Sequence, residues 1–151
     1  MLQGVQEGKV YYFSADSPVG IGGHLHVCVR KEDRFIVFVV CTSQMSTISR
    51  LIQLKRMEAA TFPCLKKDNI NKFDEEFTFI NCNVVYECSH AVFVKSLSEK
   101  KIIPLEGFID SSGMAQIVKG LIMSRTITEE IKKLFAKGNL DVFCRSSESA
   151  D

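Results

Sequence analysis

Residues 24–41 read HLHVCVRKEDRFIVFVVC, two β-rich runs joined by the polar stretch KEDR. Val, Ile and Phe runs on either side of a short polar turn are typical of a β-hairpin. The first run, residues 24–30, alternates apolar with polar or thiol side chains, which predicts that both histidines and Arg30 share one face. The second run, residues 35–41, is apolar throughout, as expected for a central strand covered on both faces. The hairpin therefore brings its first and last residues together at one end.

That end of the hairpin carries side chains suited to acid–base chemistry on a phosphate ester. His24 and His26 begin the first run, and a histidine titrates near neutral pH. Thr42 and Ser43 follow the second run, and their hydroxyls can donate hydrogen bonds to a phosphate. Arg30 would add positive charge from the histidine face. These groups are sufficient to cleave RNA through its own 2′-hydroxyl, because that reaction requires no protein nucleophile.

Two other interpretations of the histidines remain open at this point. H-x-H on a strand places two imidazoles on one face, and Cys28 continues that face, an arrangement that suits zinc. In the second interpretation, His24 and His26 hydrogen-bond loop carbonyls near the start of the strand and have a structural role only. The remaining histidine, His90, is distant in the sequence.

The composition is that of one globular domain. The chain has 151 residues, 46% of them hydrophobic and 25% charged, and a formal net charge of +1. This length supports a single core, and the near-neutral charge gives no global field that would attract nucleic acid or an anionic membrane. We expect a single domain over residues 1–145 and a disordered tail over residues 146–151.

The six cysteines and the N-terminal residues predict a cytoplasmic location. No two cysteines form a C-x-x-C pair, and Cys28, Cys41, Cys64 and Cys82 lie in apolar or strand-like runs. Buried free thiols in a reducing compartment explain this pattern better than disulfides or a zinc cage. The first residues lack the basic and apolar regions of a signal peptide, and no stretch is long enough to span a membrane.

The rest of the chain predicts an α+β domain, a small antiparallel sheet or barrel followed by helices. We expect strands at residues 9–13, 62–65 and 77–87 (a strand pair or one long bent strand), loops at residues 14–23 and 66–76, and helices at residues 46–60 and 89–98. A further helix should follow an N-cap at Asp110, Ser111 or Ser112. The last helix should start at a T-x-x-E capping box, Thr126 to Glu129, and end near Gly138.

This order of segments resembles the MazF/PemK/CcdB-type toxin domain, a small SH3-like antiparallel β-barrel with C-terminal helices. Two short motifs carry the resemblance. Gly23-His24 matches the loop in which the family has G-x-R-P or G-H-R-P. Residues 40–44, V-C-T-S-Q, match the end of the family's third strand. The resemblance covers roughly residues 8–135.

The resemblance implies the toxin of a type II toxin–antitoxin system. Such a toxin is a homodimeric endoribonuclease that cleaves single-stranded RNA without a metal ion or other cofactor. It does not bind a membrane, and an antitoxin protein inhibits it. Thr42 falls on the family's catalytic threonine, whereas Leu25 stands in place of its catalytic arginine. We expect a site with His24, His26, Thr42 and Ser43 as catalytic residues and with Arg30, Gln44 and Gly23 contacting the substrate.

The leucine at position 25 leaves three alternatives. His24 and His26 have taken over the acid–base and phosphate contacts, Arg30 reaches in from the same strand, or the nuclease activity is lost. In the last case the chain would be a non-catalytic protein- or nucleic-acid-binding module on the same barrel.

Overall fold

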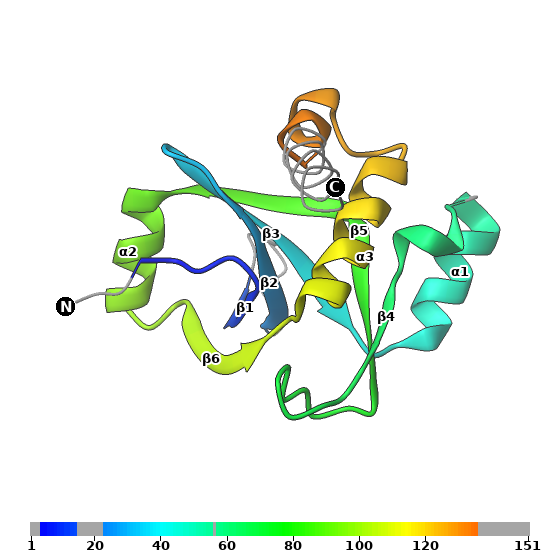
Figure 1. The fold of residues 1–151 in the computed structure, drawn as a ribbon, viewed down its shortest axis with the longest axis horizontal. Coiled ribbons are helices and arrows are strands. Elements are labelled where there is room, and N and C mark those ends of the chain that lie inside the picture. The colour runs from blue at the N-terminus through cyan, green and yellow to red at the C-terminus, as the bar shows by residue number, and fades with distance from the viewer. Residues whose placement is uncertain (1–3, 15–22, 56, 136–151) are drawn as a thin grey trace, which may run out of the picture.

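The computed structural model describes residues 4–14, 23–55 and 57–135. These residues form a mixed α+β fold on one six-stranded antiparallel sheet, in the order β4-β5-β3-β2-β1-β6 (Figure 1). The strands are β1 Lys9–Phe13, β2 His24–Lys31, β3 Phe35–Thr42, β4 Cys64–Lys66, β5 Phe77–Ser89 and β6 Ile103–Phe108. The helical elements are α1 Met45–Lys55, the 3-10 turn η1 Ala59–Thr61, α2 His90–Ser98 and α3 Ser111–Met123.

The expected hairpin is confirmed as the antiparallel pair β2–β3, with His26 opposite Val40. The first strand, β1, has the expected bounds and pairs with β2 on the side away from β3. Strand β6 was not expected, although it forms one edge of the sheet beside β1. It contains Pro104, which has no N–H to donate and is tolerated in an edge strand.

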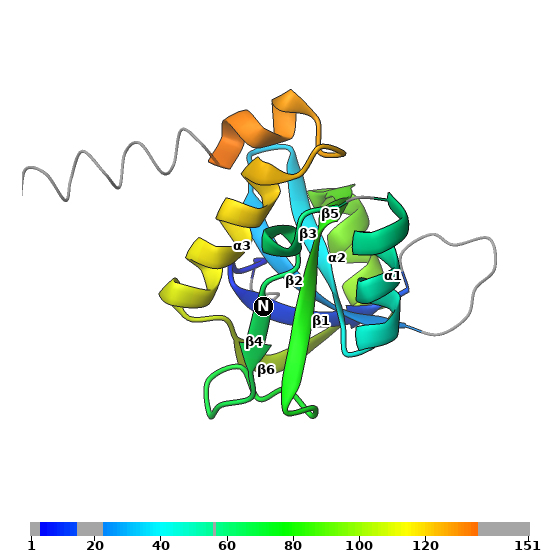
Figure 2. The ribbon, with the colours of Figure 1, turned by 90° about the vertical axis from the view of Figure 1, so that its right-hand side faces the viewer.

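The sheet curls into a half-barrel. Its two edge strands, β4 and β6, lie near each other in Figure 2, and the loop between β4 and β5 contacts β6. The Phe108 N–H donates a hydrogen bond to the Ile70 carbonyl over 2.9 Å. At the preceding position, Gly107, a Cβ atom would overlap the backbone oxygen of Asn71. Glycine at position 107 therefore allows the two backbones to approach closely where the sheet edges meet.

Two hydrophobic cores cover the two faces of the sheet. The α3-side core contains Val27, Val29, Val37 and Val39 from β2 and β3 together with apolar residues of α3. The α2-side core is rich in aromatic residues, among them Tyr11, Phe13, Phe38 and Phe93. Figures 1 and 2 show α2 and α3 on opposite sides of these strands. The prediction that the second hairpin strand is covered on both faces is confirmed.

Strand β5 is one long strand, interrupted where its sequence contains two asparagines. Val39 pairs with Val85 but Val40 pairs with Asn81, so residues 82–84 bulge out of the ladder. Within the bulge, buried Asn83 donates to the Thr61 hydroxyl over 2.8 Å and accepts from the Ser124 hydroxyl over 2.6 Å. These hydrogen bonds connect β5 with η1 and with the residue that ends α3.

Replacing Asn83 with alanine should lower the free energy of unfolding by about 2–4 kcal/mol, because the buried Thr61 and Ser124 hydroxyls lose a partner. Urea denaturation would measure this loss. Asn69→Ala is the control, since Asn69 is exposed, and it should change the free energy by less than about 0.5 kcal/mol. Equal effects of the two substitutions would show that the Asn83 hydrogen bonds do not stabilise the fold.

The helices follow the sequence prediction with two corrections. Asp110 is the N-cap of α3, its carboxylate accepting from the Gly113 N–H, and Ser89 caps α2 in the same way. The expected helix over residues 46–60 instead ends at Lys55 and is followed by η1. The prediction that the last helix starts with a capping box at Thr126 is wrong. The helix covers residues 129–135, and the Thr128 hydroxyl accepts from the Ile131 N–H at its start. The Thr126 hydroxyl donates to the Asn83 carbonyl.

None of the helices within the described ranges has the length and apolar character needed to cross a bilayer. Residues 15–22 of the expected loop, the expected helix end near Gly138 and the expected tail over residues 146–151 lie outside the described residues.

Candidate functional site

Five of the predicted site residues line one surface hollow of about 250 Å³ at the open end of the β2–β3 hairpin. They are Gly23, His24, Thr42, Ser43 and Gln44. They meet because the chain enters β2 and leaves β3 at the same end of an antiparallel pair. The hollow defined by these residues is called the hairpin-end hollow below.

The residues that follow β3 form an ordered turn into α1. The Thr42 hydroxyl accepts from the Gln44 N–H over 3.2 Å, and the Gln44 carbonyl accepts from the Ile48 N–H over 3.3 Å. The Gln44 side chain in turn accepts from the Thr47 hydroxyl over 3.1 Å. The hairpin-end hollow therefore lies beside the start of α1, where unpaired backbone N–H groups and the helix dipole favour an anion.

Four further residues that line the hollow come from segments whose sequence gives no sign that they lie near the hairpin. Asp74 and Glu75 lie in the loop before β5, Thr78 lies on β5, and Tyr12 lies on β1. The alternation of β1 was a signal for Tyr12, since Tyr11 and Phe13 face the α2-side core. The acidic run at residues 74–76 indicates only a loop, and nothing in the local pattern places it beside β2.

Gly23 contributes to the hollow by having no side chain. A Cβ atom at this position would lie 2.6 Å from Cζ of Tyr12 and 2.9 Å from its hydroxyl oxygen. The Tyr12 ring therefore packs directly on the Gly23 backbone, with 40% of the residue still exposed.

Substituting Gly23 with alanine should displace the Tyr12 ring while changing the free energy of unfolding by less than about 1 kcal/mol, because the outer end of an exposed side chain can move. NMR spectra of the tyrosine ring protons would detect the displacement, and urea denaturation would measure the stability. Gly4→Ala is the matched control, since its Cβ would meet only the flexible end of Lys31. Unchanged Tyr12 signals in the Gly23 variant would contradict the packing described here.

His26 lies in the interior rather than in the hairpin-end hollow. It is 2% exposed and stacks on Phe13, with ring centroids 3.8 Å apart and an interplanar angle of 12°. Its Nδ1 lies 2.9 Å from the His24 carbonyl oxygen. Burial lowers the pKa of His26 from 6.5 to about 4, so the ring is neutral at neutral pH. A neutral His26 can donate through Nδ1–H to that carbonyl, which positions the backbone of His24.

Arg30 does not share a face with the histidines, and that prediction is wrong. The ladder shifts register between Cys28 and Arg30, so Arg30 lies opposite Val37, a residue of the α3-side core. Its Nε donates to Glu32 Oε1 over 2.7 Å. This ion pair lies at the turn of the hairpin, the end opposite to the hollow.

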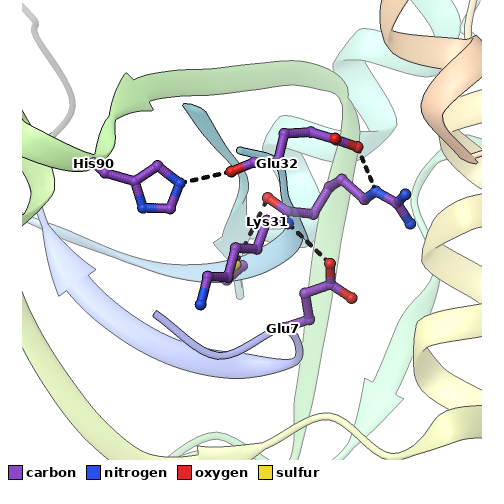
Figure 3. Close-up of polar contacts among 6 residues, drawn as sticks. Glu7, Lys31, Glu32 and His90 are labelled. Atoms are coloured by element: carbon purple, nitrogen blue, oxygen red, sulfur yellow. Dashed lines mark hydrogen bonds and ion pairs between the residues drawn. The ribbon is translucent and has the colours of Figure 1, made fainter. Parts of the chain in front are cut away.

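The turn end of the hairpin is tied to the rest of the protein by separate hydrogen bonds. His90 Nε2, at the start of α2, donates to the Glu32 carbonyl over 2.6 Å, and the Glu7 carboxylate accepts from the Lys31 N–H over 2.9 Å (Figure 3). Figure 3 shows His90 and Glu7 approaching Glu32 and Lys31 from different segments. His90 therefore has a structural partner far from the hairpin-end hollow.

The alternative zinc site at His24, His26 and Cys28 does not form. Cys28 is fully buried, and burial raises the pKa of its thiol to about 12. No three His, Cys, Asp or Glu side chains in residues 4–14, 23–55 and 57–135 are grouped to hold a metal ion. The five described cysteines are free thiols, as expected, but Cys64 is exposed rather than buried. Cys144 lies outside the described residues.

The residues that line the hairpin-end hollow carry one imidazole, four hydroxyls and two carboxylates, and α1 begins at the residue after Gln44. Its described lining contains no Arg or Lys, and Leu25 is one of the lining residues. A scan against protein-family models and a search of curated proteins found no match for this chain.

Proposed function

We propose that this chain is the toxin of a type II toxin–antitoxin system, a metal-independent endoribonuclease with a MazF/PemK-like, SH3-like barrel, and that the hairpin-end hollow is its active site. The observation that supports this proposal most is the meeting of His24, Thr42, Ser43 and Gln44 at one hollow. These are the residues at which the two motifs of the resemblance fall. The homodimer and the antitoxin partner are parts of the same proposal and rest on the resemblance, and the cytoplasmic location rests on the cysteine pattern.

The proposed reaction uses the 2′-hydroxyl of the RNA as nucleophile. His24 takes the proton of this hydroxyl, the 2′-oxygen forms a bond to phosphorus, and the bond from phosphorus to the 5′-oxygen breaks. A 2′,3′-cyclic phosphate and a 5′-hydroxyl end result. Because His26 is enclosed beside Phe13, the leaving 5′-oxygen takes its proton from solvent at the exposed hollow.

The developing charge on the phosphate meets neutral donors in this scheme. The Thr42 and Ser43 hydroxyls and the N–H groups at the start of α1 supply hydrogen bonds to its oxygens. Leu25 stands where the resemblance expects an arginine, and Arg30 is paired with Glu32 at the other end of β2. We therefore propose an enzyme slower than a version with an arginine at position 25.

A second candidate function has one observation in its favour. The described lining of the hairpin-end hollow carries two carboxylates, from Asp74 and Glu75, and no side-chain cation. Such a lining repels a phosphate, which suits a non-catalytic module that binds a protein or the bases of a nucleic acid.

One experiment separates the two functions. The wild-type protein is expressed under an inducible promoter, growth is followed, and cellular RNA is examined for new ends. Purified protein is then incubated with single-stranded RNA in the presence of a chelator. The toxin proposal expects arrested growth and RNA cut with 5′-hydroxyl ends despite the chelator. Unaffected growth together with intact RNA in both assays would reject it and favour the binding module.

A further inference from the structure

The hairpin-end hollow contains groups that the proposed cleavage does not use. Tyr12 is 40% exposed, and its ring packs close to Gly23, which has no side chain. Asp74 and Glu75 contribute carboxylates, and Thr78 contributes a hydroxyl. A volume of about 250 Å³ is below the range of drug-sized ligand sites and suits one small planar ring system.

Thr78 is the most informative of these residues. It is only 4% exposed, it lines the hollow, and its hydroxyl makes no hydrogen bond to another described residue. Among the described residues no buried side-chain oxygen or nitrogen lacks a partner, so this unpaired hydroxyl is open to the hollow, where a ligand atom can reach it. A threonine hydroxyl can donate as well as accept.

These groups match the edge of one nucleobase. Carboxylates only accept hydrogen bonds, and guanine is the RNA base that presents two adjacent donors, N1–H and the N2 amino group, on its Watson–Crick edge. The neighbouring O6 of guanine is an acceptor, which suits the Thr78 hydroxyl as donor. Adenine presents an acceptor at N1 and would face the carboxylates unfavourably. An exposed aromatic ring is the usual stacking platform for an unpaired base.

We propose that the hairpin-end hollow binds an unpaired guanine of single-stranded RNA, stacked on Tyr12 and read by Asp74, Glu75 and Thr78. This assignment rests on the proposed function for the identity of the polymer and adds the base that the site selects. It also explains how an RNA can bind beside two carboxylates. In this arrangement the carboxylates face the base, and the phosphate lies beside the start of α1. The guanine would then lie next to the scissile phosphate.

Binding should be measured apart from cleavage. The probes are fluorescently labelled uridine hexamers that carry 2′-O-methyl groups on every ribose and one central guanine, adenine, cytosine or uracil. Without a free 2′-hydroxyl these RNAs cannot be cut by the proposed reaction, so fluorescence anisotropy reports affinity alone. We expect the guanine probe to bind at least about tenfold more tightly than the others.

Three sets of variants assign the preference to residues. Asp74→Asn combined with Glu75→Gln, and separately Thr78→Val, should remove most of the guanine preference. Tyr12→Ala should weaken all four probes about tenfold, whereas Tyr12→Phe should leave them unchanged, because stacking uses the ring alone. Glu76→Gln is the matched control, since Glu76 is an exposed carboxylate of the same segment outside the hollow. It should behave as wild type.

The outcomes separate this inference from the nuclease proposal. Guanine-selective binding by a protein that leaves RNA intact would support the base assignment and reject the nuclease. RNA cleavage together with equal affinity for all four probes would overturn the guanine assignment and leave the nuclease standing. A guanine preference that survives in the Asp74/Glu75 double variant would also overturn it, as would the absence of binding to any probe, whereas the cleavage assay alone decides the nuclease proposal.

Discussion

Acidification from about pH 7 to about pH 4 is expected to remove roughly 3 kcal/mol of folding free energy through His26 alone. The pKa of His26 is 6.5 in the unfolded chain and about 4 in the native protein, with burial as the main cause. Between these two values the unfolded chain binds a proton that the native protein does not. Stability is therefore complete above the unfolded pKa and falls as the pH drops toward the native one.

The variant His26→Phe isolates this contribution. A phenylalanine has a similar planar shape and can keep the stack on Phe13, but it cannot be protonated. It loses the contact with the His24 carbonyl, which lowers stability at every pH without adding a pH dependence. Urea denaturation near neutral pH and near the native pKa should therefore show a larger acid-induced loss for wild type than for the variant. Equal losses would mean that His26 is accessible to protons in the native state.

Replacing His24 with alanine should reduce RNA cleavage by roughly 10²–10⁴-fold if it is the general base. Thr42→Ala should cost roughly 10²–10³-fold, the usual effect of removing one donor to a developing oxyanion. Both residues line the hairpin-end hollow and lie outside the two cores, so both variants should fold. Initial rates of cleavage of a single-stranded RNA, with unfolding curves measured alongside, would test this.

Ser49→Ala is the matched control for these substitutions. Ser49 is an exposed hydroxyl residue of α1 that lies beyond the first turn and does not line the hollow, and its variant should retain full activity. Activity that is unchanged in His24→Ala would remove the imidazole from the mechanism. Loss of activity in the Ser49 variant would point to an effect on α1 rather than on the chemistry.

The sequence predicted the parts of the fold whose signals are local. The alternating and apolar runs of β2 and β3, with the polar turn between them, define the hairpin within a single stretch. The sequence also predicted three possible N-cap residues for α3, and Asp110 is the one whose side chain caps the helix. Strand β6 was missed because Pro104 and Gly107 interrupt its pattern, and its place beside β1 depends on a pairing distant in the sequence.

Only the site residues at the ends of the β2–β3 hairpin could be predicted from the sequence. Antiparallel pairing alone places His24 near Thr42, Ser43 and Gln44. Alternation assigned His26 to a face of the sheet, but whether that face is exposed depends on α2, more than fifty residues later in the chain. The register shift before Arg30 has no sequence signal, and it moves that side chain to the opposite face.

Asp74, Glu75 and Thr78 could not have been placed in the site from the sequence. They join the hollow because the loop between β4 and β5 is held against β6 by the hydrogen bond from Phe108 to Ile70. That contact, in turn, requires the close approach at Gly107. The components that we assign to base recognition therefore depend on the closure of the half-barrel.

Amide chemical-shift mapping with the guanine-containing 2′-O-methyl hexamer tests whether this protein binds RNA at the hairpin-end hollow. We expect perturbations concentrated at Tyr12, residues 23–25, residues 42–46 and residues 74–78. A second hollow, of about 240 Å³, is lined by residues that include Asn83 and Arg125, and it provides the internal comparison. Perturbations centred at this second hollow, or none near residues 23–25 and 42–46, would show that RNA does not bind at the hairpin-end hollow.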